Sequence, residues 1–298
     1  MTSERSAPRS SYPAIAVVLG VAALFGTTGT ALAKAPPETD ALAAGSVRLL
    51  VGGLGLCLVA HRNLRTAVNH RMTMTVGAVG VAVYQLGFFD ATRRTGVAMA
   101  TVVTIAVSPL ASRIIGAFRG RPAPSALWYA AGAMIAAGLT LLVGFGSDGV
   151  KVNTAGIAAA ALAGVSYAVY TEAGSTAIAR GLDSTTSMAA LFLGGGVLSS
   201  PVLLFRDVSW LGTSRGIAVI AWLAIITLTL AYIGFGWGLR VLAPTTVVML
   251  TLLEPVVASV LAVTVLDESL ATVAWVGAAL IVLAMPLVGL STRTTVRA

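Results

Sequence analysis

Ten apolar stretches of about 20 residues, joined by short polar connections, run through this sequence. They lie near residues 13–33, 41–60, 72–89, 95–117, 125–145, 155–178, 186–205, 214–236, 242–265 and 271–290. An α-helix of about 20 apolar residues spans the hydrocarbon core of a bilayer. The pattern therefore predicts an all-α integral membrane protein with ten transmembrane helices, surrounded by a lipid bilayer.

The composition agrees with a membrane protein and argues against other classes. Hydrophobic residues make up 57% of the chain and charged residues 10%, whereas roughly a quarter of the residues in soluble domains are charged. The net charge of +8 comes from single arginines between apolar stretches, so no basic face predicts a nucleic acid partner. The sequence contains no G-x-x-x-x-G-K-[ST] motif, so a nucleotide is not expected either.

Neither a cofactor, nor a metal, nor an enzymatic activity is predicted. Cys57 is the single cysteine, and the two histidines, His61 and His70, lie in a short connection. The sequence has no H-E-x-x-H motif, no G-x-S-x-G motif and no helix with paired carboxylates. Because the connections are short, any site must lie within the membrane, which favours a transporter or a channel over an enzyme.

The distribution of basic residues predicts that both termini lie in the cytoplasm of a cell-membrane protein. In that orientation, twelve of the 19 Lys and Arg residues fall in cytoplasmic parts and six in external parts. Cytoplasmic connections of membrane proteins collect Lys and Arg. We expect residues 13–33 to be retained as the first helix, although their end, Ala31-Leu32-Ala33, is also typical of a cleaved signal peptide.

An internal repeat relates the two halves of the chain. An offset of 146 residues aligns Arg94 with Arg240 and Pro109 with Pro255 without a gap. Each half has five helices, an odd number, so the second half must cross the membrane upside down relative to the first. We therefore predict two inverted five-helix repeats, at 13–145 and 155–290, between cytoplasmic tails at 1–12 and 291–298.

Four stretches carry a further signal. They are ALFGTTGTALA in the first helix, GSVRLLVGGLGL in the second, YQLGFFDATRRTGVAMATVVTIAVSPL across the third and fourth, and LLEPVVASVLAVTVLDESL across the ninth and tenth. Over the whole chain the sequence resembles the drug/metabolite transporter superfamily, in its ten-helix EamA-type branch. The resemblance implies an inverted-repeat fold, a cavity between the halves, and export of amino acids or other small metabolites.

The first half departs from the pattern of that family. Arg121 replaces the usual acidic residue of the turn that corresponds to Asp267-Glu268, and Ser108 stands where the second half has Glu254. Because of this departure, the resemblance does not identify the substrate, but the expected architecture is unaffected.

Glu254 is the charged residue that lies deepest in a predicted helix. A carboxylate inside a bilayer costs several kcal/mol unless it faces a partner or a wet cavity, and we predict no Arg or Lys near its depth. Pro255 lacks an N–H and frees carbonyls of the preceding turn, which makes the position polar. Glu254 is therefore a candidate for coupling transport to protons, and the alternative is a protonated structural carboxyl.

Hydroxyl groups flank this position on two helices. Thr251 lies one turn before Glu254, and the counterpart helix carries Thr101, Thr104 and Ser108 at helical spacing. These side chains are candidates for lining a substrate cavity. The alternative is that they bond back to their own helix or join neighbouring helices.

Aromatic and amide side chains complete the set of cavity candidates. Contacts with a small amphipathic substrate are predicted for Tyr84, Gln85, Phe88, Tyr167, Thr171 and Tyr232. Gln85 is the strongest of these, because hydrocarbon offers its amide no partner. The alternative for the tyrosines is an aromatic belt at the lipid interface, which is the role we predict for Trp128, Trp210 and Trp275.

Two further charged residues lie within predicted helices. We expect Arg48 to reach toward the membrane surface and to pair with Glu38 or Asp40. Glu172 is a second coupling candidate, and Arg180 at the membrane edge is its expected partner.

Small residues at fourfold spacing predict close packing of the sixth helix. They are Gly156, Ala160, Gly164 and Ala168.

Together these features predict a secondary transporter that exports amino acids or related amphipathic metabolites and drugs by alternating access. A closed structural or regulatory bundle and a passive channel are the alternatives. A water-sized cavity lined by Gln85, Ser108 and Glu254 would distinguish a carrier from a closed bundle. Saturable flux with counterflow would distinguish it from a channel.

Overall fold

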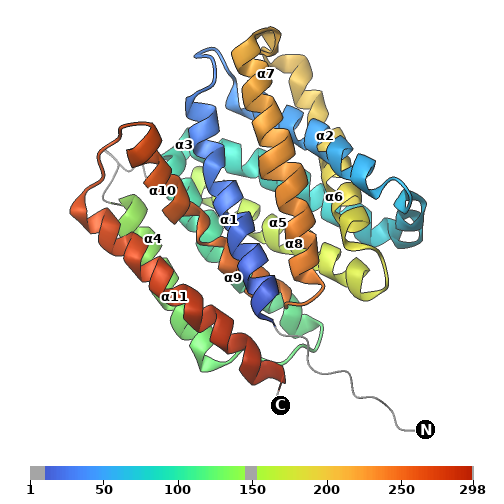
Figure 1. Ribbon diagram of the computed structural model, residues 1–298, viewed down its shortest axis with the longest axis vertical. Coiled ribbons are helices and arrows are strands. Elements are labelled where there is room, and N and C mark those ends of the chain that lie inside the picture. The colour runs from blue at the N-terminus through green and yellow to red at the C-terminus, as the bar shows by residue number, and fades with distance from the viewer. Residues whose placement is uncertain (1–10, 145–152, 297–298) are drawn as a thin grey trace.

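The computed structural model describes residues 11–144 and 153–296, and these ranges contain helices and no strands. Ten segments of the described residues are long and apolar enough to cross a membrane. The predicted all-α fold with ten spanning helices is therefore confirmed. The first residues of α1 and the last residues of α11 lie toward the same end of the molecule (Figure 1), as an even number of crossings requires.

The first half contains four α-helices for five crossings. They are α1 (Tyr12–Ala33), α2 (Ala41–Ala60), α3 (Arg71–Phe118) and α4 (Ala126–Gly144), with a short 3₁₀-helix η1 (Leu64–His70) before α3. The α3 helix is two crossings joined at Gly96, whose φ of 83° and ψ of 159° break the helical path. Only glycine adopts this backbone region readily, so Gly96 supplies the turn between the third and fourth spans.

The second half divides its crossings into shorter pieces. They are α5 (Thr154–Ala179), α6 (Ser184–Ser199) with η2 (Ser200–Phe205), the short η3 (Ser209–Gly212), α7 (Ser214–Ala221), the π-helix η4 (Trp222–Leu230), α8 (Ala231–Leu239), α9 (Pro244–Thr251), α10 (Glu254–Val265) and α11 (Thr272–Val296). The α7, η4 and α8 helices form one crossing, and α9 and α10 form another.

The break between α9 and α10 follows from Pro255. Pro255 has no N–H to donate to the carbonyl of Thr251. The N–H groups of Leu252 and Leu253 donate to the carbonyls three residues earlier, as in a 3₁₀ turn. The equivalent Pro109 stays inside the continuous α3. The helix of the second repeat is therefore interrupted just before Glu254, whereas the equivalent helix of the first repeat is not interrupted there.

The packing of the helices follows the repeat. The α5 helix, first of the second half, packs against both crossings of α3, and α1, first of the first half, packs against α8, α9 and α10. The α2 helix pairs with α6, and α4 pairs with α11. Each contact made by a helix of the first half is therefore matched by a contact of the equivalent helix in the second half. This is the pattern of two repeats related by a pseudo-twofold axis.

Glycines permit the closest of these contacts. A Cβ added at Gly138 of α4 would lie 2.7 Å from the carbonyl oxygen of Gly277 of α11. In the predicted stripe of the sixth span, a Cβ at Gly164 would lie 2.6 Å from the Thr104 carbonyl oxygen. The close packing predicted for this helix is therefore present.

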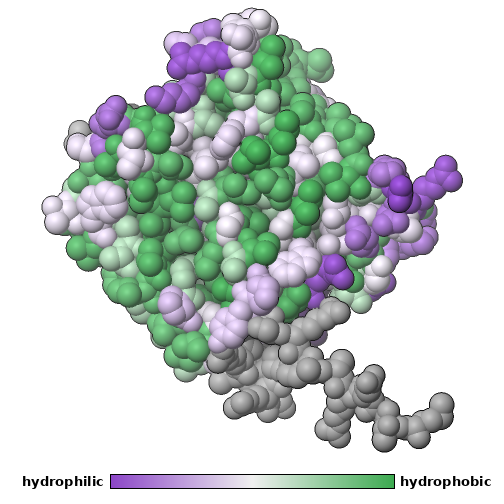
Figure 2. Space-filling view, viewed as in Figure 1, coloured by the Kyte–Doolittle hydropathy of each residue, from purple (hydrophilic) through white to green (hydrophobic). Residues whose placement is uncertain are grey.

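The surface is apolar over its centre, and hydrophilic residues gather toward its edges (Figure 2). At one end, Arg206 bonds Asp40 at 3.2 Å and Arg215 donates to the Lys34 carbonyl. These contacts join connections that the predicted topology places on the same side of the membrane.

Only one of the three tryptophans predicted for the lipid interface is widely exposed. Trp275 is 41% exposed, whereas Trp128 and Trp210 are buried. The predictions for Trp128 and Trp210 are wrong. Trp128 packs in the main hydrophobic core, and Trp210 of η3 packs beside Val219, Ile220 and Leu223.

Candidate functional site

Aromatic rings from both halves meet in the interior. We call this set the aromatic cluster; its members are Tyr84 of α3, Tyr167 and Tyr170 of α5, Phe192 of α6, and Tyr232 and Phe235 of α8. Neighbouring ring centroids lie 5.0–6.4 Å apart, within the range of favourable aromatic pairs, and those of Phe192 and Tyr232 lie closer, at 3.8 Å. The hydroxyls of Tyr170 and Tyr232 lie 3.2 Å apart. Three predicted residues, Tyr84, Tyr167 and Tyr232, are thus brought together.

Two further predicted residues touch this cluster. Phe88 stacks on Tyr84, with ring centroids 6.1 Å apart. The hydroxyl of Thr251 lies 2.9 Å from the hydroxyl of Tyr167, directly before the break between α9 and α10. Thr251 also donates to the Val248 carbonyl, so its oxygen both bonds back to its own helix and joins the cluster.

Glu254 and Arg48 bring opposite charges to this region. Glu254 begins α10 and is partly buried, with no hydrogen bond or ion pair from any described residue. Arg48 lies within electrostatic range of Glu254, Tyr84 and Tyr232. The expectation that no arginine lies near Glu254 is therefore wrong.

Arg48 reaches inward because η4 offers it an acceptor. One guanidinium nitrogen donates to the Thr227 carbonyl oxygen at 3.1 Å, while the buried Nε has no partner among the described residues. The predicted pairing of Arg48 with Asp40 is not made, since Asp40 caps α2 and binds Arg206. Short π-helical segments are rare and are frequent at functional sites.

Gln85 and Thr171 are buried polar residues without a partner. The Gln85 amide nitrogen and the Thr171 hydroxyl have no hydrogen bond within the described residues. Gln85 faces Gly45 of α2, because a Cβ added there would collide with the amide nitrogen. Gly45 lies one turn before Arg48 on the same helix, so Gln85 and Arg48 lie along one face of α2.

The remaining hydroxyl candidates contact backbone carbonyls or lie only partly buried. Thr104 donates to the Ala160 carbonyl at 3.0 Å and thereby joins α3 to α5. Ser108 donates to the Thr104 carbonyl at 2.6 Å. Thr101 is partly buried. These bonds match the structural alternative given above for Thr104 and Ser108.

Glu172 lies in a buried ionic cluster that links the halves. Its side chain is 1% exposed, and Arg121 contacts both carboxylate oxygens at 2.8 and 2.9 Å. Ser112 donates to it at 2.9 Å, and Arg119 lies 3.5 Å away. The partners are thus arginines of the connection between α3 and α4, not the predicted Arg180.

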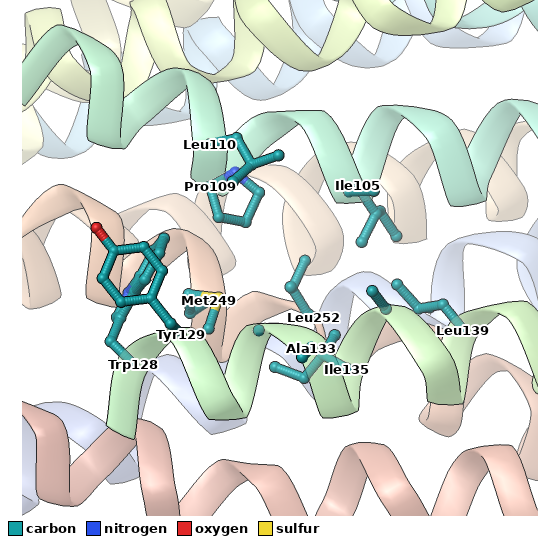
Figure 3. A pocket seen from close by; sticks show the side chains of 13 residues that line it. Ile105, Pro109, Leu110, Trp128, Tyr129, Ala133, Ile135, Leu139, Met249 and Leu252 are labelled. Carbon is teal, nitrogen blue, oxygen red and sulfur yellow. The ribbon is translucent and has the colours of Figure 1, made fainter. Parts of the chain in front are cut away.

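A cavity of about 250 Å³ lies outside the aromatic cluster (Figure 3). Residues of α3, α4 and α9 line it, among them Ile105, Pro109, Trp128, Ile135 and Met249. None of Gln85, Ser108 and Glu254, the residues of the predicted cavity, lines this one.

Four residues of the site are not identified from the sequence. Tyr170 lies one turn after Tyr167, so the helical spacing could have identified it. Phe192 and Phe235 lie in apolar helices and carry no distinct signal. Arg48 is expected at the surface because the π-helix whose carbonyl accepts its hydrogen bond has no signature in the sequence.

Comparison with known proteins identifies the family and supports the fold. The model of the EamA-like transporter family matches residues 12–144 and again residues 154–290. An uncharacterized transporter of Bacillus subtilis (strain 168), YwfM, is 33% identical over 280 residues, which are 93% of each chain. A solved crystal structure superposes with a TM-score of 0.78 at 22% identity and covers 96% of this chain and 99% of that one, which supports the fold. The chain is therefore a membrane transporter that belongs to the EamA-like family.

Proposed function

We propose that this transporter exports a small amphipathic metabolite, of the class of amino acids and related compounds, across the cell membrane by alternating access. The observation that carries the proposal is the aromatic cluster together with Arg48, which lies within electrostatic range of Glu254 and of two tyrosines of the cluster. Rings offer apolar contact, and an arginine with an unpaired Nε offers a carboxylate its charge and donors. This combination suits a molecule with a carboxylate and an apolar body.

The placement of these residues in both repeats supports the proposed alternating access. The cluster takes residues from α3 in the first repeat and from α5, α6 and α8 in the second. Rocking one repeat against the other would change which end of this region is open. Both termini are placed in the cytoplasm, so the ends of α3 and α5 that carry Arg119, Arg121 and Glu172 are cytoplasmic in this proposal.

Glu254 is the proposed proton-coupling residue. Its carboxyl has no ion pair within 4 Å in the described residues, in contrast to Glu172, which is held by arginines. A carboxyl that is not locked by a partner can gain a proton on one side and lose it on the other.

Proteoliposomes test the transport activity directly. A panel of radiolabelled amino acids and drugs would be assayed for saturable uptake and for counterflow, with and without a pH gradient. We expect saturable counterflow for at least one amphipathic carboxylate. Flux without saturation or counterflow would indicate a channel, and absence of flux for the whole panel would contradict the proposed substrate class.

The coupling role has its own pair of variants. We expect Glu254→Gln to retain exchange and to lose its response to a pH gradient, because the amide keeps the shape but cannot carry a proton. Glu268→Gln, at an exposed acidic residue after α10, is the matched control and should behave like the unmodified protein. Normal gradient-driven uptake by Glu254→Gln would return Glu254 to a structural role.

A further inference from the structure

The cavity between α3, α4 and α9 is elongated and apolar. Its α4 side runs from Trp128 to Leu139, which is about 16 Å at 1.5 Å per residue. Apolar cavities of about 150 Å³ stay dry and bind benzene, and this one has a volume of about 250 Å³. It has room for a hydrocarbon chain that lies along the helices.

The cavity opens to the surface that faces lipid. Leu110 and Tyr129, which line it, are 55% and 48% exposed. The α4 and α11 helices stand together along one edge of the molecule (Figure 1), so the α4 side of the cavity lies toward the periphery. No residue of the aromatic cluster lines the cavity. Exposed apolar residues such as Ile114 and Phe118 continue the same face of α3 toward its end.

Three residues that line this cavity or lie one turn along the chain from its lining have buried polar atoms without a partner among the described residues. Trp128 lines the cavity and is 3% exposed, yet its indole N–H has no acceptor among the described residues. The Arg113 guanidinium, one turn past Pro109, has two buried nitrogens that no described residue accepts from. Ser125, three residues before Trp128, has a buried hydroxyl that is likewise unpaired within the described part of the chain. Buried donors of these kinds normally bond to an acceptor.

We propose that this cavity binds a phospholipid with an anionic headgroup. One acyl chain fills the space beside Ile105, Gly132 and Met249. The indole N–H of Trp128 donates to an ester carbonyl, and Arg113 pairs with the phosphate region. A lipid matches all three features at once, because it joins an apolar chain to ester acceptors and a negative charge. The proposal does not depend on the identity of the transported substrate.

Quenching of tryptophan fluorescence by brominated acyl chains tests where the chain lies. Variants that keep a single tryptophan at 128, 210 or 275 would be reconstituted in phospholipids with brominated or plain chains. We expect Trp128 to be quenched as strongly as the exposed Trp275, although its own side chain is buried, and Trp210 to be unaffected. Quenching of Trp128 no stronger than that of Trp210 would overturn the proposal.

Lipid retention gives a second measurement that needs no tryptophan replacement. Gly132→Leu narrows the cavity, because a Cβ there meets only Met249 Cε at 3.6 Å. Ala137→Leu, at an exposed residue of α4 outside the lining, is the matched control. By native mass spectrometry, Gly132→Leu should lose the phosphatidylglycerol that the unmodified protein and Ala137→Leu retain. Equal retention by all three would contradict a chain in the cavity.

Arg113→Gln tests the headgroup. One basic residue beside an anionic headgroup favours binding of that lipid over a zwitterionic one by about fivefold. The ratio of phosphatidylglycerol to phosphatidylcholine that the protein retains should therefore fall by that factor. Arg206→Gln, at the opposite end, should leave the ratio unchanged. An unchanged ratio in Arg113→Gln would remove Arg113 from the site.

Discussion

Gln85 is the residue at which the binding and packing interpretations differ most clearly. Its buried amide has no hydrogen bond in the described residues, and such a group costs about 1–3 kcal/mol. We expect Gln85→Leu to leave thermal stability unchanged or raised, because the unpaired amide is removed, while the half-saturation concentration for transport rises. Thermal unfolding in detergent and uptake kinetics measure the two effects. A loss of stability together with transport would make Gln85 a packing residue.

Arg121 and Glu172 form the most deeply buried ion pair found in the described residues. Removal of one partner of a buried pair leaves the other charge uncompensated. Because Arg121 itself is 34% exposed and Arg119 remains nearby, we expect Arg121→Gln to cost about 1–3 kcal/mol.

The matched control for Arg121→Gln is Arg206→Gln, which breaks the partly exposed pair with Asp40 and should cost less than about 1 kcal/mol. Adding Glu172→Gln to Arg121→Gln should restore part of the lost stability. Equal effects of the two single variants would show that the Glu172 cluster contributes no more than a surface pair.

At the scale of elements, the turn at Gly96 depends on backbone conformation alone. A Cβ added at Gly96 meets nothing within 4 Å, but φ is 83°. We expect Gly96→Ala to destabilise the protein by about 1–3 kcal/mol. Gly20→Ala, in the regular α1 helix and also free of contacts, should be neutral or stabilising by up to about 1 kcal/mol. Indistinguishable unfolding temperatures for these two variants would contradict the assigned turn.

The elements differ in how far the sequence predicts them. All ten spans follow from hydropathy, because a membrane helix must be apolar over its full length. A weak point at Pro255 follows from the missing N–H, but the full break does not, because Pro109 lacks the same N–H and stays inside α3. The π-helix η4 cannot be predicted in this way, since the sequence WLAIITLTL would suit an α-helix equally well. The inward position of Arg48 depends on η4 and is therefore not predicted either. The buried place of Trp210 depends on the tertiary fold of η3, which local sequence does not determine.

At the scale of the whole molecule, the inverted repeat predicts the side on which each connection lies. Cysteines placed at Arg119 and at Asp267, in a variant without Cys57, should differ in labelling by an impermeant thiol reagent in intact cells. We expect Asp267→Cys to be labelled and Arg119→Cys to be protected, because five crossings per repeat invert the second half. Equal labelling of both would contradict the topology.

The central claim is that the region between the repeats opens alternately to the two sides of the membrane. The most direct test is the accessibility of a cysteine at Thr251, beside the aromatic cluster, in the variant without Cys57. We predict that an impermeant thiol reagent reaches Thr251→Cys from either side in sealed vesicles of known orientation, and that substrate slows both reactions. Labelling from neither side, with Asp267→Cys labelled normally, would show a closed bundle and contradict the account.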